Sequence, residues 1–187
     1  MRLFLALELA PDLIDALESA IAPLRAEAPE LEWVAPRKRH LTLKFLGEVA
    51  EERLARIVAL VDNVASEHRP FSMQLGGVGA FPNFRRARVV WIGVEHDARL
   101  ELLHHDLEIA GETEGFEIEG RAFRPHVTLA RVRLPMVDAR ARRLARAARA
   151  IDFSATQHVA EFTLLESTLA EAGATYRRLH AASLGGR

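Results

Sequence analysis

The chain has 187 residues, the size of one ordinary domain, and its 49% hydrophobic and 27% charged residues are typical of a folded globular protein. The formal net charge of −1 shows no overall basic excess of the kind that marks many nucleic-acid-binding domains. Cysteine is absent, which excludes a disulfide framework, thiolate zinc sites and a cysteine nucleophile. No apolar run approaches the ~20 residues that a membrane-spanning helix needs.

The amino-terminal segment has the features of a buried strand rather than a secretory leader. Leucines alternate with other residues over positions 3–9, and Glu8 interrupts the apolar run. A period of two is typical of a strand, whereas a leader needs an uninterrupted apolar core. Together with the absence of cysteine, this favours a cytoplasmic protein, and we expect a monomer.

The remaining pattern alternates strands and helices. In chain order it predicts a strand at 3–9, a helix from Pro11 to about Leu24, strands at 31–34 and 40–46, a helix at 51–67, a strand at 71–75, a glycine-rich stretch at 76–79 and a loop at 80–86, a strand at 89–94, a helix at 97–113, a strand at 123–132, a helix at 138–150, and strands at 153–156, 159–166 and 175–181. Pro23 is expected to kink or shorten the first helix. The glycine-rich stretch is unsuited to a regular strand interior.

This order predicts an α+β fold with antiparallel or mixed pairing. No linker-like stretch divides the chain, so residues 1–187 are predicted to form a single domain. We expect two lobes, with two sheets and outer helices, whose motif-bearing halves run roughly over 1–94 and 95–187. An approximate two-fold would relate the lobes around a central cleft.

The sequence His-x-Thr-Leu occurs twice, at residues 40–43 and 126–129. Residues two apart in a strand share a face, so the histidine and threonine of each copy point one way and the aliphatic residues the other. One copy alone arises easily by chance, and a histidine in a strand is more often structural. Two copies, each in an alternating pattern beside basic residues, favour a functional site.

Two imidazoles and two hydroxyls suit acid–base chemistry on a phosphodiester. Histidine can act as acid or base because its unperturbed pKa of ~6.5 lies near working pH. One neutral imidazole takes a proton from water while a cationic one protonates the departing oxygen on the opposite side of phosphorus. Hydroxyls and a guanidinium would stabilise the phosphate oxygens.

Other candidate sites are weaker. His104 and His105 lie near Asp106 and Glu108, but this helical spacing lacks a second ligand cluster and is typical of a solvated helix face. The glycine-rich stretch at 76–79 is not followed by the Gly-Lys-Ser/Thr of a P-loop. We therefore expect no metal, no other cofactor and no requirement for ATP. A nucleophile-elbow pattern for a serine triad is also absent.

The motif blocks HLTLKFLGEV at 40–49 and FRPHVTLAR at 123–131 resemble the two-histidine phosphoesterase superfamily. Within it the chain is most similar to the bacterial and archaeal RNA 2′,3′-cyclic phosphodiesterases, once called 2′-5′ RNA ligases. The resemblance extends to residues 2–6, 79–82, 88–93 and 162–167 and to Tyr176. It implies a bilobal α+β fold with a central cleft, and hydrolysis of an RNA 2′,3′-cyclic phosphate to a 2′-phosphate without metal or ATP.

The resemblance also implies roles for the motif residues. His40 corresponds to the proton donor to the 3′ leaving oxygen, and His126 to the acceptor that activates water. Thr42 and Thr128 correspond to residues that bind phosphate oxygens.

Two further substrate-binding candidates depend on strand geometry. Arg131 belongs to the family pattern, yet strict alternation places it on the face opposite His126, so the strand must end or bulge there, or Arg131 must act from the edge. Lys44 shares the His40 face on alternation alone.

Alternatives stay open at this point. The same site would suit a small cyclic nucleotide or ADP-ribose cyclic phosphate in place of an RNA end. A protein of another class, one that binds RNA ends without meaningful turnover, would also carry these residues. Weak reversible ligation to a 2′-5′ linkage is a further expectation, because hydrolysis and ligation share a path.

Overall fold

The computed structural model describes residues 1–170 and 173–185. The strands are β1 (Arg2–Glu8), β2 (Glu32–Trp33), β3 (His40–Glu48), β4 (Phe71–Phe81), β5 (Val89–Val94), β6 (His126–Arg131), β7 (Ser154–Val159), β8 (Glu161–Ala170) and β9 (Gly173–Ser183). The helices are α1 (Pro11–Glu27), α2 (Leu54–Glu67), α3 (Ala98–Thr113) and α4 (Asp138–Arg149), with 3₁₀ turns η1 (Pro36–Lys38), η2 (Glu51–Arg53) and η3 (Phe84–Arg86). None of the described helices is both long and apolar enough to cross a membrane.

The strands pair in the order β7-β4-β5-β6-β3-β1-β8-β9, and β2 pairs with β6. All of these pairings are antiparallel. The predicted α+β class is therefore confirmed. The two expected sheets are hydrogen-bonded into one, because β3 and β6 pair where Leu41 lies opposite Val127. The two motif strands are thus neighbours at the centre of the molecule.

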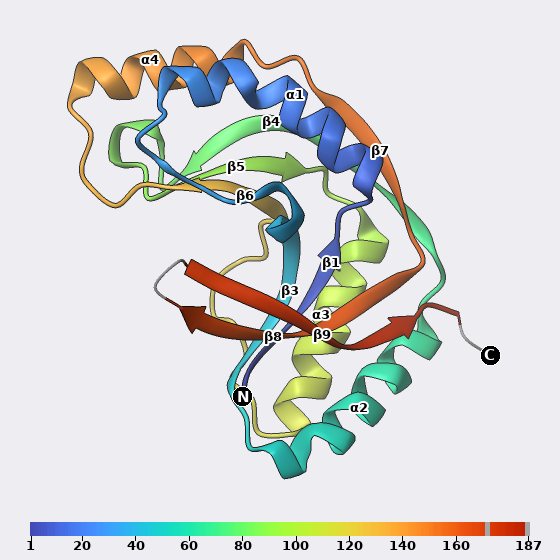
Figure 1. The fold of residues 1–187 in the computed structure, drawn as a ribbon. Coiled ribbons are helices and arrows are strands. Elements are labelled where there is room, and N and C mark those ends of the chain that lie inside the picture. The colour runs from blue at the N-terminus through green and yellow to red at the C-terminus, as the bar shows by residue number, and fades with distance from the viewer. Residues whose placement is uncertain (171–172, 186–187) are drawn as a thin grey trace.

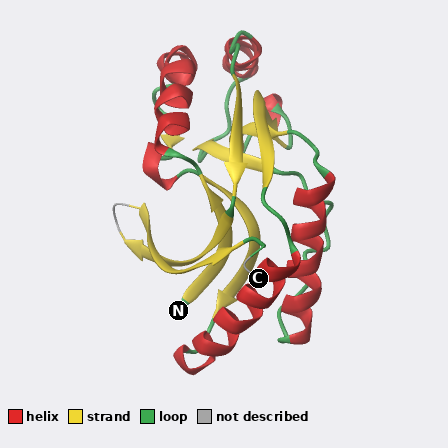
Figure 2. Cartoon of the chain, turned by 90° about the vertical axis from the view of Figure 1, so that its right-hand side faces the viewer, coloured by secondary structure: helices red, strands yellow, loops and turns green. Residues whose placement is uncertain are grey.

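The helices lie in two pairs, one over each half of the sheet (Figure 1). Helices α1 and α4 contact each other, and α4 packs on β4; helices α2 and α3 contact each other and pack on β9 and β3, respectively. Figure 2 shows that the strands near the amino terminus curve, with α2 and α3 against one face. No helix of residues 1–170 and 173–185 covers the opposite face of this half.

The aliphatic residues of both motifs explain which face is covered. Leu41, Val127 and Leu129 are fully buried, and Leu43 is only 2% exposed. They belong to the main hydrophobic core together with apolar residues of α1, α2 and α3. Burying such a side chain contributes about 1.5–3 kcal/mol relative to exposure, so the motif strands are held in register by their aliphatic face. Their polar residues are left on the opposite, open face.

Two elements extend beyond the ends predicted for them: the strand that begins at Phe71 and the helix that begins at Pro11. Strand β4 continues through the glycine-rich stretch to Phe81, with a register shift after Gly76 and a positive φ of +69° at Gly77. At Gly79 a Cβ atom would lie 2.3 Å from the Trp91 indole, so only glycine lets this ring cross the strand. Helix α1 also continues past Pro23 to Glu27 instead of ending there.

Candidate active site

The histidines of the two motifs are held in the same way. The Nδ1 atom of His40 lies 2.9 Å from the Lys38 carbonyl oxygen, and Nδ1 of His126 lies 2.7 Å from the Arg124 carbonyl oxygen. A carbonyl oxygen can only accept, so Nδ1 carries the proton in both rings. Each Nε2 atom is then free to accept a proton from a substrate or, when protonated, to donate one.

Aromatic rings fix both imidazoles from the side. The His40 ring lies 5.0 Å from Phe4 and meets Tyr176 edge-on at 5.2 Å between centroids. The His126 ring meets Phe81 edge-on at 4.9 Å, and Trp91 lies 6.3 Å away. These apolar surroundings restrict ring rotation and exclude water from one side of each imidazole.

Burial lowers the pKa of both histidines below the ordinary value. For His40, burial has the largest effect, the hydrogen bond to the Lys38 carbonyl opposes it, the Glu8 carboxylate also raises the pKa, and the charges of Arg131 and His126 lower it. For His126, burial lowers the pKa and the hydrogen bond to the Arg124 carbonyl raises it. His126 and Arg131 therefore lie close enough to His40 to affect its charge.

The strands flanking the motifs give the two histidines different neighbours. Glu8 lies opposite His40 in the β1–β3 ladder, whereas Gly93 lies opposite His126 in the β5–β6 ladder. The Glu8 carboxylate accepts a hydrogen bond of 2.9 Å from the Thr163 hydroxyl and pairs with Arg178 at 2.9 Å. A carboxylate thus faces one of two otherwise similar motifs, and its charge raises the pKa of His40, whereas no carboxylate of the described residues acts on His126 in this way.

Both motif strands bulge at the same place. In β3, Thr42 pairs with Ala6 but Lys44 pairs with the adjacent Leu5, so Leu43 is an extra residue. In β6, the residues at 128 and 130 pair with adjacent residues at 91 and 90, so position 129 is extra in the same way. A bulge of one residue reverses the facing of everything beyond it. Alternation therefore holds through the leucine of each motif and fails from the next residue on.

The bulges determine on which face of the sheet Arg131 and Lys44 lie. Beyond the bulge Arg131 lies on the His126 face, which agrees with its charge effect on His40. The prediction that Lys44 shares the His40 face is wrong, because Lys44 is turned into the interior and only 3% exposed. Its ammonium group donates to the Glu108 carboxylate at 2.7 Å and to the Glu117 carbonyl at 2.9 Å.

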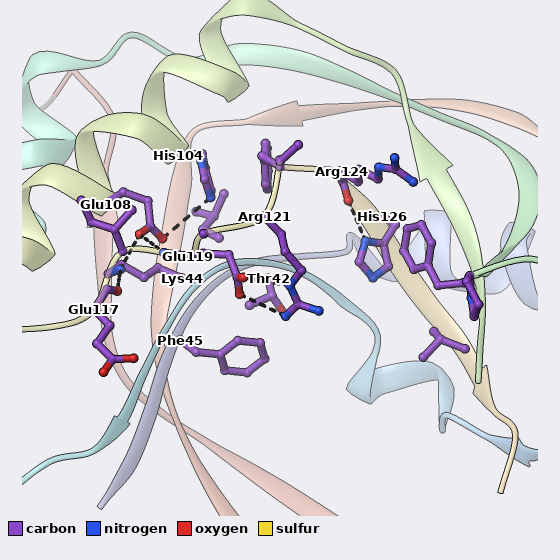
Figure 3. Close-up of a pocket in the computed structure, with 18 of the residues that line it drawn as sticks. Thr42, Lys44, Phe45, His104, Glu108, Glu117, Glu119, Arg121, Arg124 and His126 are labelled. Atoms are coloured by element: carbon purple, nitrogen blue, oxygen red, sulfur yellow. Dashed lines mark hydrogen bonds and ion pairs between the residues drawn. The ribbon is translucent and has the colours of Figure 1, made fainter. Parts of the chain in front are cut away.

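A cavity of about 1050 Å³ opens beside His126 (Figure 3). Its lining includes Thr42 and Lys44 among the predicted site residues, but not His40, Thr128 or Arg131. The other residues that line it are Leu43, Phe45, Phe81, Pro82, Arg88, Val89, His104, Glu108, residues 117–124 and His126. The cavity therefore extends from the His126 side of the site, away from His40.

Several of these lining residues escaped the sequence analysis. Phe45 is 65% exposed although it is a large apolar side chain, and Figure 3 shows it pointing into the cavity below Thr42 and Arg121. Arg121 and Arg124 come from the loop before β6, which has no periodic pattern. The sequence could have indicated Phe45. It lies five residues after His40, just as Arg131, a predicted site residue, lies five residues after His126.

His104, the first of the two neighbouring histidines on α3, contacts an aromatic ring and a carboxylate. His104 stacks on Phe123 with 3.9 Å between ring centroids, and its Nε2 lies 3.8 Å from the Glu108 carboxylate. Burial lowers the pKa of His104, which the charge of Glu108 opposes. Over residues 1–170 and 173–185, no group of three or more histidine, aspartate and glutamate side chains lies together in a way that could hold a metal ion.

Comparison with known proteins agrees with the duplication of the His-x-Thr-Leu motif on β3 and β6. The family model of LigT-like phosphoesterases matches the chain twice, over residues 7–91 and 92–176. The chain belongs to the LigT-like phosphoesterase family. An RNA 2′,3′-cyclic phosphodiesterase of Methanothermobacter thermautotrophicus is 33% identical over 176 residues, which cover 94% of this chain and 95% of that protein. One of Archaeoglobus fulgidus is 38% identical over 136 residues, 71% of this chain and 73% of that protein.

Solved structures share the fold over the whole chain. The crystal structure of TT0787 of Thermus thermophilus matches with a TM-score of 0.81 and 31% identity, covering 100% of this chain and 99% of that one. Escherichia coli LigT complexed with 3′-AMP matches with a TM-score of 0.76 and 28% identity, covering 98% and 97%. The family assigned from the paired motifs is thereby confirmed.

Proposed function

We propose that this protein is an RNA 2′,3′-cyclic phosphodiesterase that hydrolyses the cyclic phosphate to a 2′-phosphate. The observation that carries the proposal is the pair of equivalent imidazoles, each with Nδ1 bound to a carbonyl and Nε2 free, on adjacent strands of one open face. Relatives at 33% and 38% identity that carry the name RNA 2′,3′-cyclic phosphodiesterase support the substrate class.

The roles of the two histidines follow from their different neighbours. His126 acts as the base: its neutral ring accepts a proton from water at Nε2 as the oxygen attacks phosphorus. His40 acts as the acid: its protonated ring donates the Nε2 proton to O3′ as the P–O3′ bond breaks. The Glu8 carboxylate opposite His40 supports this assignment, because it favours the charged imidazole that the acid requires.

Hydroxyl and guanidinium groups complete the site. Thr42 and Thr128 share the faces of the two histidines and would donate hydrogen bonds to the non-bridging phosphate oxygens. Arg131 has no ion pair among the described residues and lies near His40, so its guanidinium is available to the charge that develops on phosphorus. We propose that these groups suffice without a metal ion or a nucleotide cofactor.

The direct test is an oligoribonucleotide that ends in a 2′,3′-cyclic phosphate, incubated with the protein, excess EDTA and no added nucleotide. The expected product is a 2′-phosphate end, which a phosphatase of broad specificity removes and an enzyme that removes only 3′-phosphates leaves in place, whereas the unreacted cyclic phosphate resists both. Formation of a 3′-phosphate would contradict the assigned leaving oxygen. No turnover by folded protein would contradict the proposed function.

The lowered histidine pKa values predict the pH dependence of the reaction. The active form needs His126 neutral and His40 protonated, and this combination is most populated between their two pKa values. Burial lowers both pKa values. The maximum of kcat/KM, which reports the free enzyme, is therefore expected below about pH 6.5, with a decline on either side. A profile measured with circular dichroism as a control for folding checks this, and a maximum in the alkaline range would contradict it.

A further inference from the structure

We propose that Arg39 is a positioning residue for His40: through a buried ion pair with Glu18 it fixes the carbonyl group that orients the imidazole. The proposal rests on the proposed function only in naming His40 as the acid. The His40 ring presents Nε2 to the open face while its Nδ1–H donates to the Lys38 carbonyl oxygen at 2.9 Å. The hydrogen bond at one ring nitrogen sets the state of the other, so whatever fixes this carbonyl also fixes the acid.

In the second motif a proline fixes the equivalent carbonyl. The Arg124 carbonyl, which accepts from His126, belongs to the peptide bond that leads into Pro125. The proline ring holds its own φ at about −65° and restricts the residue before it to extended backbone. The Pro125 carbonyl oxygen in turn accepts the Val94 N–H at 3.1 Å. In the first motif the residue at this position is Arg39, whose backbone has no such covalent restraint.

The side chain of Arg39 supplies the restraint instead. It is fully buried, and its Nη2 atom lies 2.7 Å from the Glu18 carboxylate of α1. The backbone N–H of Arg39 donates to the Pro36 carbonyl oxygen at 3.2 Å. This N–H and the Lys38 carbonyl belong to one planar peptide unit, so the unit cannot rotate without breaking the hydrogen bonds at both of its ends. Anchoring Arg39 in the interior therefore limits the movement of the carbonyl that His40 requires.

Glu18 is itself held in place by a second arginine. The Arg25 guanidinium lies 2.7 Å from the Glu18 carboxylate and 5.3 Å from the centroid of the Trp33 ring. Burial lowers the pKa of Arg39, the charge and hydrogen bond of Glu18 oppose this, and the charge of Arg25 lowers it further. An apolar side chain would occupy the interior position of Arg39 at a smaller desolvation cost. The ion pair supplies a fixed direction that an apolar side chain lacks.

The test reads the tautomer and the pKa of each histidine by NMR of protein with isotope-labelled histidine. In wild type both neutral rings are expected to carry their proton on Nδ1. In Arg39→Met the neutral His40 ring is expected to become a mixture with the Nε2–H form. Its pKa is expected to fall, because the hydrogen bond to the Lys38 carbonyl raises it. His126 in the same spectra should not change, and Pro125→Ala should give the reverse result.

Kinetics connect this change to the reaction. Arg39→Met is expected to lower kcat for the cyclic phosphate by about tenfold with little change in KM, because a misplaced acid slows the chemical step rather than binding. Arg39→Lys keeps a cation opposite Glu18 and is expected to recover most of kcat together with the Nδ1–H tautomer of His40. Arg37→Met removes an exposed cation from the same 3₁₀ turn and is expected to match wild type in both measurements.

An unchanged tautomer and pKa of His40 in folded Arg39→Met would overturn the positioning role, and so would equal changes in both histidines, which indicate general loosening. If Arg39→Met does not fold, Glu18→Gln decides the question, because it alters the partner that is 29% exposed. It is expected to shift His40 in the same direction, and an unchanged His40 would again overturn the role. The NMR measurement needs no substrate. Failure of wild type to hydrolyse the cyclic phosphate would therefore contradict the proposed function and leave the positioning of His40 intact.

Discussion

Replacing His126 with Ala is expected to lower kcat for cyclic phosphate hydrolysis by about 10²–10⁴-fold, and replacing His40 with Ala by a similar factor. Each substitution removes one proton carrier, whereas the strand keeps its buried aliphatic face. The double variant is expected to lose much less than the product of the two factors, because an acid and a base that act in one step do not contribute independently.

Matched variants make this expectation specific. His126→Asn keeps a side-chain donor for the Arg124 carbonyl but has no group that can accept a proton, so it is expected to be as slow as His126→Ala. His105→Ala removes an imidazole that is exposed on α3 and lies outside the cavity lining, and turnover is expected to match wild type. Thermal unfolding of all variants checks the fold. Wild-type turnover in either single alanine variant would exclude acid–base catalysis by this pair.

Sequence periodicity predicted the facing of all four residues of each motif correctly, and failed from the fifth position on. Alternation correctly separates His40 and Thr42 from Leu41, because facing in a regular strand depends only on residue spacing. The bulges at Leu43 and Leu129 depend on the partner strands β1 and β5, which lie far away in the sequence. No local pattern marks them, so the expected placement of Lys44 was wrong.

The same limit applies to parts of the fold. Composition at positions 76–79 correctly indicates an irregular backbone, since Gly77 has a positive φ, but the irregularity is a bulge within β4 rather than its end. The reason for glycine at 79 is the Trp91 indole, which belongs to another strand. Likewise, the α+β class follows from element order, whereas the joining of the sheet at its centre depends on the pairing of β3 with β6, where Leu41 lies opposite Val127.

The second large effect is expected from Lys44, in stability rather than in catalysis. Lys44 and Glu108 form a buried ion pair of 2.7 Å, with 2% and 7% of their side chains exposed. The Glu108 carboxylate also accepts the Glu119 backbone N–H at 2.9 Å, and Lys44 donates to the Glu117 carbonyl. The pair therefore ties the loop that lines the cavity to the interior of the sheet, at the bulge that turns Lys44 inward.

Lys44→Met is expected to destabilise the protein by about 3–5 kcal/mol, because it leaves the Glu108 carboxylate buried without its partner. Adding Glu108→Gln should recover most of this loss, since the amide is uncharged and its oxygen still accepts the Glu119 N–H. Urea denaturation of wild type, both single variants and the double variant measures the coupling between the two positions. A double variant less stable than Lys44→Met would mean that the hydrogen bonds of the Glu108 carboxylate, rather than the paired charges, hold this loop.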